Sequence, residues 1–355
     1  MAHVFLRWKK IRKRFTLGSG YMIKVSFKMK YTHHSSRNKR GIVKNHYICL
    51  PKLKRMKNDI LLHYKVAELP FDLQLADDDK LNQLLTNYEP FIITSPQKPI
   101  FHLTVVPEQA ELMDLSSFTE TISFEEETQY FKIYKATDTD ETLIVMTLAR
   151  DPNLVAYLHL QQDYTFAKLQ VKGNTSFRLY SLNNSLMMMF AFAGASHNIL
   201  LQHSSVITYK GKGYLFLGKS GTGKSTHSSL WLKHIDGTTL LNDDNPAIGI
   251  NNKGIPMVYG TPWSGKTPCY KNESALIGGF VRLWQAPKNE IHKLNVIQAY
   301  AALLPTVSGM KWERKMADDM NKTLNELVTK VPVLNLKCLP DEEAARMSFH
   351  AFTGE

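Results

Sequence analysis

Cysteine is scarce in this sequence. The 355 residues include 3 cysteines, Cys49, Cys269 and Cys338, and no two of them form a CxxC pair. This spacing indicates neither a disulfide framework nor a zinc site. Free thiols suit a reducing cytoplasm, where we expect the protein to reside.

Long apolar runs are also missing. No window approaches the roughly 18–20 apolar residues that span a bilayer, and no apolar segment near the N-terminus ends in the small residues of a secretory signal. The most apolar stretch, SLMMMFAFAGASHNIL at 185–200, contains His and Asn and predicts a buried helix. We therefore expect no membrane span.

Acidic residues are absent from residues 1–55, which hold 16 of the 44 lysines and arginines. The remaining 300 residues carry 28 basic and 32 acidic side chains, so the net charge of +12 comes from this leader. We interpret the leader as a disordered extension, or as translated upstream sequence with the native start at Met56. The alternatives are a basic arm that touches phosphates or lipid headgroups and a mitochondrial transit peptide. Because the body has no basic run, we expect no nucleic-acid partner.

Two domains are predicted after the leader, which gives an α/β fold with a mixed sheet preceded by a β-rich domain. Residues 56–195 contain β-branched and aromatic runs separated by turn residues, and a helix over about 183–195 leads out of them. Residues 196–355 begin with a hairpin around the turn KGKG. Later helices are predicted at 295–305, 312–331 and 341–352.

A glycine-rich loop, GKSGTGKS at 218–225, matches the phosphate-binding pattern G-x-x-x-x-G-K-[ST] at every fixed position. An apolar strand precedes it and a helical run follows, so that backbone N–H groups and a helix N-terminus would face an anion. The pattern predicts that Lys224 reaches the β and γ phosphates of a nucleotide and that the Ser225 hydroxyl binds Mg²⁺. The candidate nucleotide-binding residues are Gly218, Lys219, Ser220, Gly221, Thr222, Gly223, Lys224, Ser225 and Thr226.

A pair of aspartates, Asp243 and Asp244, follows the strand TTLLN, and only 17 residues separate Ser225 from Asp243. One short helix and one strand fit in that interval, so the pair is expected at the carboxyl end of a strand beside the loop. One carboxylate would coordinate Mg²⁺, and the other would accept a proton from an attacking hydroxyl. The alternative is a surface turn, since NDDNP is also a good turn sequence.

Three further residues are candidates for the same site. Lys266, in the loop GTPWSGKTPCY, would neutralise charge on the transferring phosphoryl group, or else is an ordinary exposed lysine. Arg282 lies inside an apolar strand and either pairs structurally or points at a phosphate. His203 precedes the hairpin and would line the site, although a lone histidine is usually structural.

Together these residues resemble the kinase domain of the bacterial HPr kinase/phosphorylase family, whose P-loop core is similar to that of the phosphoenolpyruvate carboxykinases. The resemblance covers His203, residues 218–225 and residues 240–244. It implies transfer of the ATP γ-phosphoryl group to a serine hydroxyl, with Asp243 as base and with Ser225 and Asp244 on Mg²⁺. It also implies a homo-oligomer. The chain departs from the family at Thr226, where bifunctional members have glutamate, which makes it a divergent member.

The sequence therefore predicts a Mg-ATP-dependent kinase acting on a hydroxyl of a protein, a peptide or a small molecule. In this reading Lys266 or Arg282 stabilises the developing charge. One alternative is an ATP-sensing module in which Asp243 and Asp244 serve only Mg²⁺. Another is a carboxykinase-like enzyme acting on a small carboxylate, for which the sequence offers no clear arginine cluster.

Overall fold

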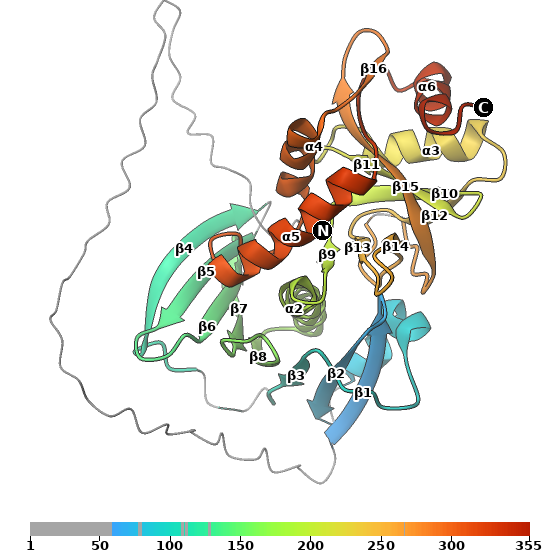
Figure 1. Cartoon of the computed structure of the whole chain (residues 1–355). Helices are drawn as coiled ribbons and strands as arrows, with labels where there is room; N and C mark the ends of the chain where they lie inside the picture. Colours follow the sequence, from blue (N-terminus) through green and yellow to red (C-terminus); the bar gives the residue numbers. More distant parts are fainter. Residues whose placement is uncertain (1–58, 77–79, 108–109, 111–112, 127–128, 266) are drawn as a thin grey trace, which may run out of the picture. The chain divides into compact units, whose positions relative to one another are not determined.

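Two β-sheets and six α-helices account for most of the part of the chain described by the computed structural model, which comprises residues 59–355 apart from 77–79, 108–109, 111–112, 127–128 and 266 (Figure 1). The predictions for the leader and for Lys266 fall outside these residues. All described residues belong to one compact unit.

The first sheet has eight strands in the order β1-β2-β3-β8-β7-β6-β5-β4. Most neighbours are antiparallel, and β3 pairs in parallel with both β2 and β8. Along β5 buried and exposed residues alternate, which is the period expected when one face of a sheet is covered. The strands are β1 (Asp59–Val66), β2 (Leu69–Ala76), β3 (His102–Val105), β4 (Phe118–Glu126), β5 (Gln129–Ala136), β6 (Thr142–Leu148), β7 (Asp151–Leu160) and β8 (Phe166–Lys172). Two short elements, α1 (Leu81–Leu84) and η1 (Thr86–Phe91), follow β2.

Helix α2 (Thr175–Ala195) connects the two sheets and contacts β7 and β8 of the first sheet and β9 (Ile199–Leu201) of the second. It begins earlier than the predicted 183, because the Asn174 side chain accepts a hydrogen bond from the Phe177 N–H and caps the first turn. Its contacts on several sides explain why nearly all of its second half is buried. Even so, no helix within the described residues is long and apolar enough to cross a membrane.

The second sheet carries parallel strands at its centre. Strand β15 (Ser274–Gln285) runs parallel to β11 (Lys212–Leu217) on one side and to β17 (Val333–Cys338) on the other. Strand β10 (Ser204–Tyr209) is antiparallel to both β11 and β12 (Thr239–Asn242). Strand β12 therefore runs parallel to β11, β15 and β17. The carboxyl ends of these four strands lie at one edge of the sheet, together with the amino end of β10. The remaining strands are β13 (Ala247–Ile250), β14 (Pro256–Tyr259) and β16 (Glu290–Lys293).

These two sheets confirm the predicted α/β fold with mixed sheets and a β-rich first part. The later helices also agree with the predicted ranges to within a few residues: α4 (Val296–Leu303), α5 (Arg314–Lys330) and α6 (Glu342–Thr353), with a short η2 (Leu304–Thr306) after α4. The division into domains at residues 56–195 and 196–355 stays a prediction.

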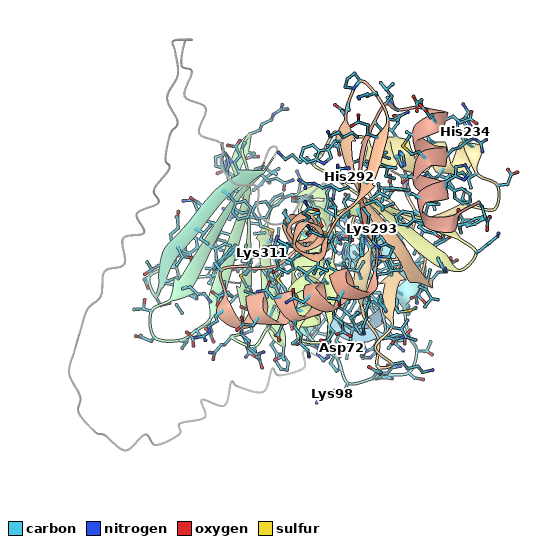
Figure 2. The ribbon with its side chains drawn as sticks, turned by 45° about the horizontal axis from the view of Figure 1, so that its top comes forward. Asp72, Lys98, His234, His292, Lys293 and Lys311 are labelled. Atoms are coloured by element: carbon cyan, nitrogen blue, oxygen red, sulfur yellow. The ribbon has the colours of Figure 1, made fainter. Side chains whose placement is uncertain are left out.

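Helices α3 (Lys224–His234) and α6 pack together on one face of the second sheet (Figure 1). The Trp231 indole is fully buried there, and its Nε1–H donates to Ser348 Oγ at 2.9 Å. Because Ser348 Oγ–H donates to the Ala345 carbonyl, His227 Nε2, 2.9 Å from the same oxygen, must be the donor of its own bond. At the far end of α3, His234 Nδ1 lies 3.2 Å from Glu342 Oε2 of α6 (Figure 2).

Burial between α3 and α6 makes His227 a pH-sensitive stabilising residue. Burial lowers the pKa of His227 from 6.5 to about 4, so the unfolded chain takes up this proton at higher pH than the folded chain. The stabilisation is complete above pH 6.5 and is lost as the pH falls towards 4. At about 1.4 kcal/mol per pKa unit, the free energy of unfolding should fall by about 3 kcal/mol across this window.

Urea unfolding at a series of pH values measures this effect. His227→Gln keeps a donor for Ser348 and does not titrate, so its free energy of unfolding should fall less steeply between pH 6.5 and 4 than that of the wild type. If the free energy of unfolding falls equally steeply with pH in the two proteins, His227 is not the source of the pH dependence. The comparison cancels the contributions of the other histidines.

Candidate functional site

The glycine loop, residues 218–223, joins the end of β11 to the start of α3. Gly221 and Gly223 have φ values of +81° and +99°, which a residue with a side chain adopts only at a cost. A Cβ added at Gly218 would lie 2.3 Å from the Thr222 Oγ1 atom. The glycines thus allow a tight turn whose N–H groups, with the N-terminus of the eleven-residue α3, suit an anion.

The first turn of α3 presents three of the residues that the sequence assigned to the nucleotide and its metal, Lys224, Ser225 and Thr226. Lys224 is 8% exposed, and its Nζ donates to the Gly218 carbonyl at 3.1 Å, so the ammonium group curls back over the loop. Ser225 and Thr226 are exposed. A cation inside the loop and a hydroxyl at its rim are the groups that a phosphate chain with a bound Mg²⁺ needs.

Asp243 lies directly after β12 and is linked to α3 through two serines. Its Oδ1 accepts a hydrogen bond of 2.7 Å from Ser205 Oγ, and Ser205 Oγ lies 2.6 Å from Ser228 Oγ. Ser228 is three residues after Ser225, on the same face of the helix. The buried Asp243 carboxylate therefore faces the helix that carries Ser225.

Asp244 turns instead towards His203, the residue before β10. His203 Nδ1 lies 3.0 Å from Asp244 Oδ1, and Asp244 Oδ2 accepts from Asn245 Nδ2 at 2.9 Å. Burial lowers the pKa of His203 despite the opposing pull of Asp244, and the nearby charge of Lys224 lowers it further. The neutral form of the imidazole therefore predominates at pH 7, with Nδ1 beside the carboxylate.

The loop around residues 260–267 passes against both aspartates. The Asn245 N–H donates to the Trp263 carbonyl at 3.1 Å, and Thr261 Oγ1 donates to the Asn245 carbonyl at 2.7 Å. A Cβ added at Gly265 would lie 3.1 Å from both the Asp243 carbonyl oxygen and the Asp244 Cβ. This close approach brings Gly265, the neighbour of Lys266 in sequence, to the acid pair.

The same loop is fastened to η1, which follows the first two strands. The Trp263 Nε1–H donates to the Tyr88 hydroxyl at 2.9 Å, and Asn87 Nδ2 donates to the Pro262 carbonyl at 3.0 Å. Both aromatic side chains are buried, with Tyr88 at 0% and Trp263 at 6% exposed. The part of the chain that carries the first sheet thus holds the loop beside the acid pair.

Tyr88→Phe should destabilise the protein, because it leaves the buried Trp263 N–H without an acceptor. An unsatisfied buried donor costs about 1–3 kcal/mol, and the free energy of unfolding should fall by that amount in urea titrations. Tyr130→Phe, which removes a hydroxyl from a side chain that is 41% exposed, is the control and should leave stability unchanged. Equal stabilities for Tyr88→Phe and the wild type would mean that this bond contributes nothing to holding the loop.

Within the described residues, no hydrogen bond or ion pair joins Arg282 to the acid pair. Its guanidinium carbon lies 4.4 Å from the centre of the Trp284 ring, on β15. The sequence also missed Ser205 and Ser228, the link between Asp243 and α3. Two polar residues at the start of the otherwise apolar run SSVITY were the signal that could have identified Ser205.

A separate row of titratable side chains crosses the first sheet. His63 Nδ1 lies 2.7 Å from Asp72 Oδ1, and His102 Nδ1 lies 3.8 Å from Asp72 Oδ2. Burial lowers the pKa of His102, so its neutral form predominates at pH 7.

Over the described ranges, no group of three or more His, Cys, Asp or Glu side chains could hold a metal by itself. A magnesium ion at the acid pair would therefore need phosphate and water oxygens to complete its coordination.

Comparison with known proteins does not identify a family for this chain. No family model matches the sequence, and no curated protein matches it. Among solved structures, the chain is similar to the Hpr(Ser) kinase/phosphatase from Coxiella burnetii, with 11% sequence identity and a TM-score of 0.25 over 43% of this chain and 93% of that one. A likeness of this size carries no argument, and activity has to be argued from the residues themselves.

Proposed function

We propose that this protein is a Mg-ATP-dependent kinase that transfers the γ-phosphoryl group to a hydroxyl. The observation that carries the proposal is the connection between Asp243 and the helix after the glycine loop, through Ser205 and Ser228. It supports a single site in which a carboxylate, a lysine and a phosphate-binding turn act together. A surface turn, the alternative reading of residues 242–246, would not require a buried aspartate with this chain of hydroxyls.

Asp243 and Ser225 are the residues that we propose to hold the magnesium ion. Magnesium prefers oxygen ligands and takes one or two carboxylates together with substrate phosphates and water. The Asp243 carboxylate faces α3, on which Ser225 is exposed in the first turn. When bound, the ion would neutralise charge on the β and γ phosphates.

Asp244 is the residue that we propose as the general base, which reverses the roles implied by the family resemblance. Its carboxylate lies beside the neutral His203, and Gly265 of the following loop lies against it. The acceptor oxygen attacks the γ phosphorus, the bond to the bridging oxygen breaks, ADP leaves, and the hydroxyl proton passes to Asp244. His203, whose Nδ1 lies 3.0 Å from the carboxylate, would orient it.

Lys224 would stabilise the charge that develops on the phosphoryl group, from its place inside the loop. We propose that Lys266 assists, because its neighbour Gly265 lies against both aspartates. Positioning and electrostatics would thus supply most of the catalysis, as phosphoryl transfer requires.

The test uses the full chain with γ-labelled ATP, Mg²⁺ and a lysate of the source cells. We expect a labelled protein, peptide or metabolite with the wild type and none with the double variant Asp243→Asn/Asp244→Asn. Lys233→Met, an exposed lysine in the last turn of α3, is the control and should label normally. If the wild type and the variants all bind ATP tightly and none transfers the phosphoryl group, the result would contradict the proposed kinase activity and favour the ATP-sensing module.

A further inference from the structure

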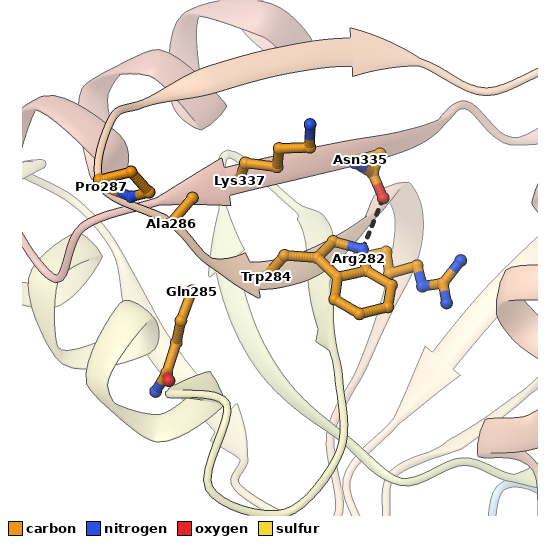
Figure 3. Close-up of a pocket in the computed structure, with 7 residues that line it drawn as sticks. All are labelled: Arg282, Trp284, Gln285, Ala286, Pro287, Asn335 and Lys337. Carbon is orange, nitrogen blue, oxygen red and sulfur yellow. Dashed lines mark hydrogen bonds between the residues drawn. The ribbon is translucent and has the colours of Figure 1, made fainter. Parts of the chain in front are cut away.

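A pocket with a volume of about 580 Å³ lies at the carboxyl ends of β15 and β17. Its walls include Arg282, Trp284, Asn335 and Lys337 (Figure 3). Small-molecule sites generally occupy about 300–1,000 Å³ and combine an apolar surface with a few polar groups. Nothing in the catalytic proposal above uses this pocket.

The indole of Trp284 forms an exposed but immobilised surface in the pocket. Its Nε1–H donates to Asn335 Oδ1 at 2.8 Å, and the Arg282 guanidinium lies 4.4 Å from the ring centre (Figure 3). Although held from two sides, the side chain is 41% exposed. A large aromatic ring that is fixed in orientation and open to solvent can stack on a flat ligand at little cost in conformational entropy.

Positive charge accompanies this surface. Arg282 is half-buried, burial lowers the pKa of its guanidinium, and no ion pair within the described residues involves it. An arginine keeps its charge, so this site favours an anion or an electron-rich ring. Lys337 adds a second cation to the pocket, with its Nζ 3.8 Å from Glu290 Oε2.

The pocket adjoins the glycine loop directly. Gln285, another of the residues that line it, donates from Nε2 to the Gly221 carbonyl at 3.1 Å, and Arg282 is the register partner of Leu217, the last residue before the loop. In the sheet, β11 lies between β10 and β15. The acid pair therefore lies on one flank of the loop, beyond β10, and the pocket lies on the other.

This arrangement fits the two ends of one ligand. A triphosphate lying along the loop with its γ-phosphate near Asp243 and Asp244 directs its other end towards β15. We propose that the pocket binds the purine nucleoside end of ATP, with the base stacked on Trp284 and with Arg282 beside the phosphate–ribose junction. This inference rests on the proposed kinase function and gives Arg282 a role in binding, in place of the charge stabilisation predicted from sequence.

Calorimetric titration of the full chain with Mg-ATP, Mg-UTP and inorganic triphosphate tests the proposal. Base–aromatic stacking is worth about 1–3 kcal/mol per base, so Trp284→Ala should weaken ATP binding by roughly 5- to 150-fold and leave triphosphate binding unchanged. Trp284→Leu, which keeps apolar bulk in case the smaller residue unfolds the protein, should show the same selective loss. Trp284→Phe should retain most of the affinity. The wild-type preference for ATP over UTP should vanish in the leucine variant.

The control is Tyr130→Ala, which truncates an aromatic side chain of the same 41% exposure on the first sheet and should bind all three ligands normally. A wild type that binds triphosphate, with an ATP affinity that Trp284→Ala and Trp284→Leu leave unchanged, would overturn this inference alone. Equal weakening of ATP and triphosphate would also overturn it, because the pocket would then act on phosphates or on an acceptor. A wild type that binds neither ligand would overturn the kinase proposal as well.

Discussion

Asp244→Asn should lower the rate of phosphoryl transfer by about 10²- to 10⁴-fold, the usual contribution of a general base. Asparagine has the shape of aspartate, and its amide oxygen can take the same place beside His203 Nδ1, which lies 3.0 Å from the carboxylate. It cannot take a proton from the acceptor at neutral pH. The measurement is the single-turnover rate with saturating Mg-ATP, and the affinity for Mg-ATP should change by less than about threefold, since a base contributes to the transition state and not to nucleotide binding.

Asp243→Asn is the matched variant, because it changes the neighbouring carboxylate in the same way. If Asp243 holds magnesium, this variant should need a higher Mg²⁺ concentration for half-maximal rate, and added Mg²⁺ should restore part of the activity. The opposite pattern, in which Asp244→Asn alters the Mg²⁺ requirement and Asp243→Asn only the rate, would restore the roles that the resemblance implies. No effect of either substitution would remove both aspartates from the reaction.

The local parts of this site could be predicted from the sequence. The glycine loop and the acid pair are separated by only 17 residues, and each signal depends on residues next to one another in the chain. The turn between β11 and α3, with positive φ at Gly221 and Gly223, lies where the pattern places it. Asp243 and Asp244 follow a strand directly, as predicted.

The long-range contacts could not be predicted, because they depend on which strands pair. Trp263 and its acceptor Tyr88 are 175 residues apart, and nothing near either residue indicates the other. The link from Ser205 to Ser228 requires α3 to pack on β10, which the sequence does not reveal. For Arg282, the sequence left open whether the side chain pairs or contacts a phosphate. Its place over Trp284 follows from the parallel pairing of β15 with β11 and β17.

The start of α2 shows a different limit. The apolar run covers only the second half of the helix, where nearly every residue is buried, so the predicted start fell at 183. The first turns carry Ser176, Arg178 and Ser181, and their boundary is set by the Asn174 cap. A capping asparagine is too common in loops to identify a helix start by itself.

Lys224→Met should reduce phosphoryl transfer by about 10²- to 10³-fold, the range seen when one donor to a developing negative charge is removed. The affinity for the phosphate chain before transfer should also fall. Because a charge-assisted hydrogen bond contributes about 1.5–3 kcal/mol, inorganic triphosphate should bind roughly 10- to 150-fold more weakly. Methionine keeps the length and apolar stem of a side chain that is only 8% exposed. Because the substitution removes a charge from that buried position, thermal stability should stay the same or rise.

Measuring activity, triphosphate affinity and thermal stability together distinguishes a catalytic lysine from a structural one. If the bond from Lys224 Nζ to the Gly218 carbonyl, 3.1 Å long, served mainly to hold the loop, Lys224→Met would lower the melting temperature along with activity. If the lysine serves phosphate, activity and triphosphate affinity fall while the melting temperature does not. Lys233→Met, which removes a charge from the exposed end of the same helix, should change neither quantity. Full activity in Lys224→Met would mean that the glycine loop does not bind the transferred phosphate, and the kinase proposal would fail at its first requirement.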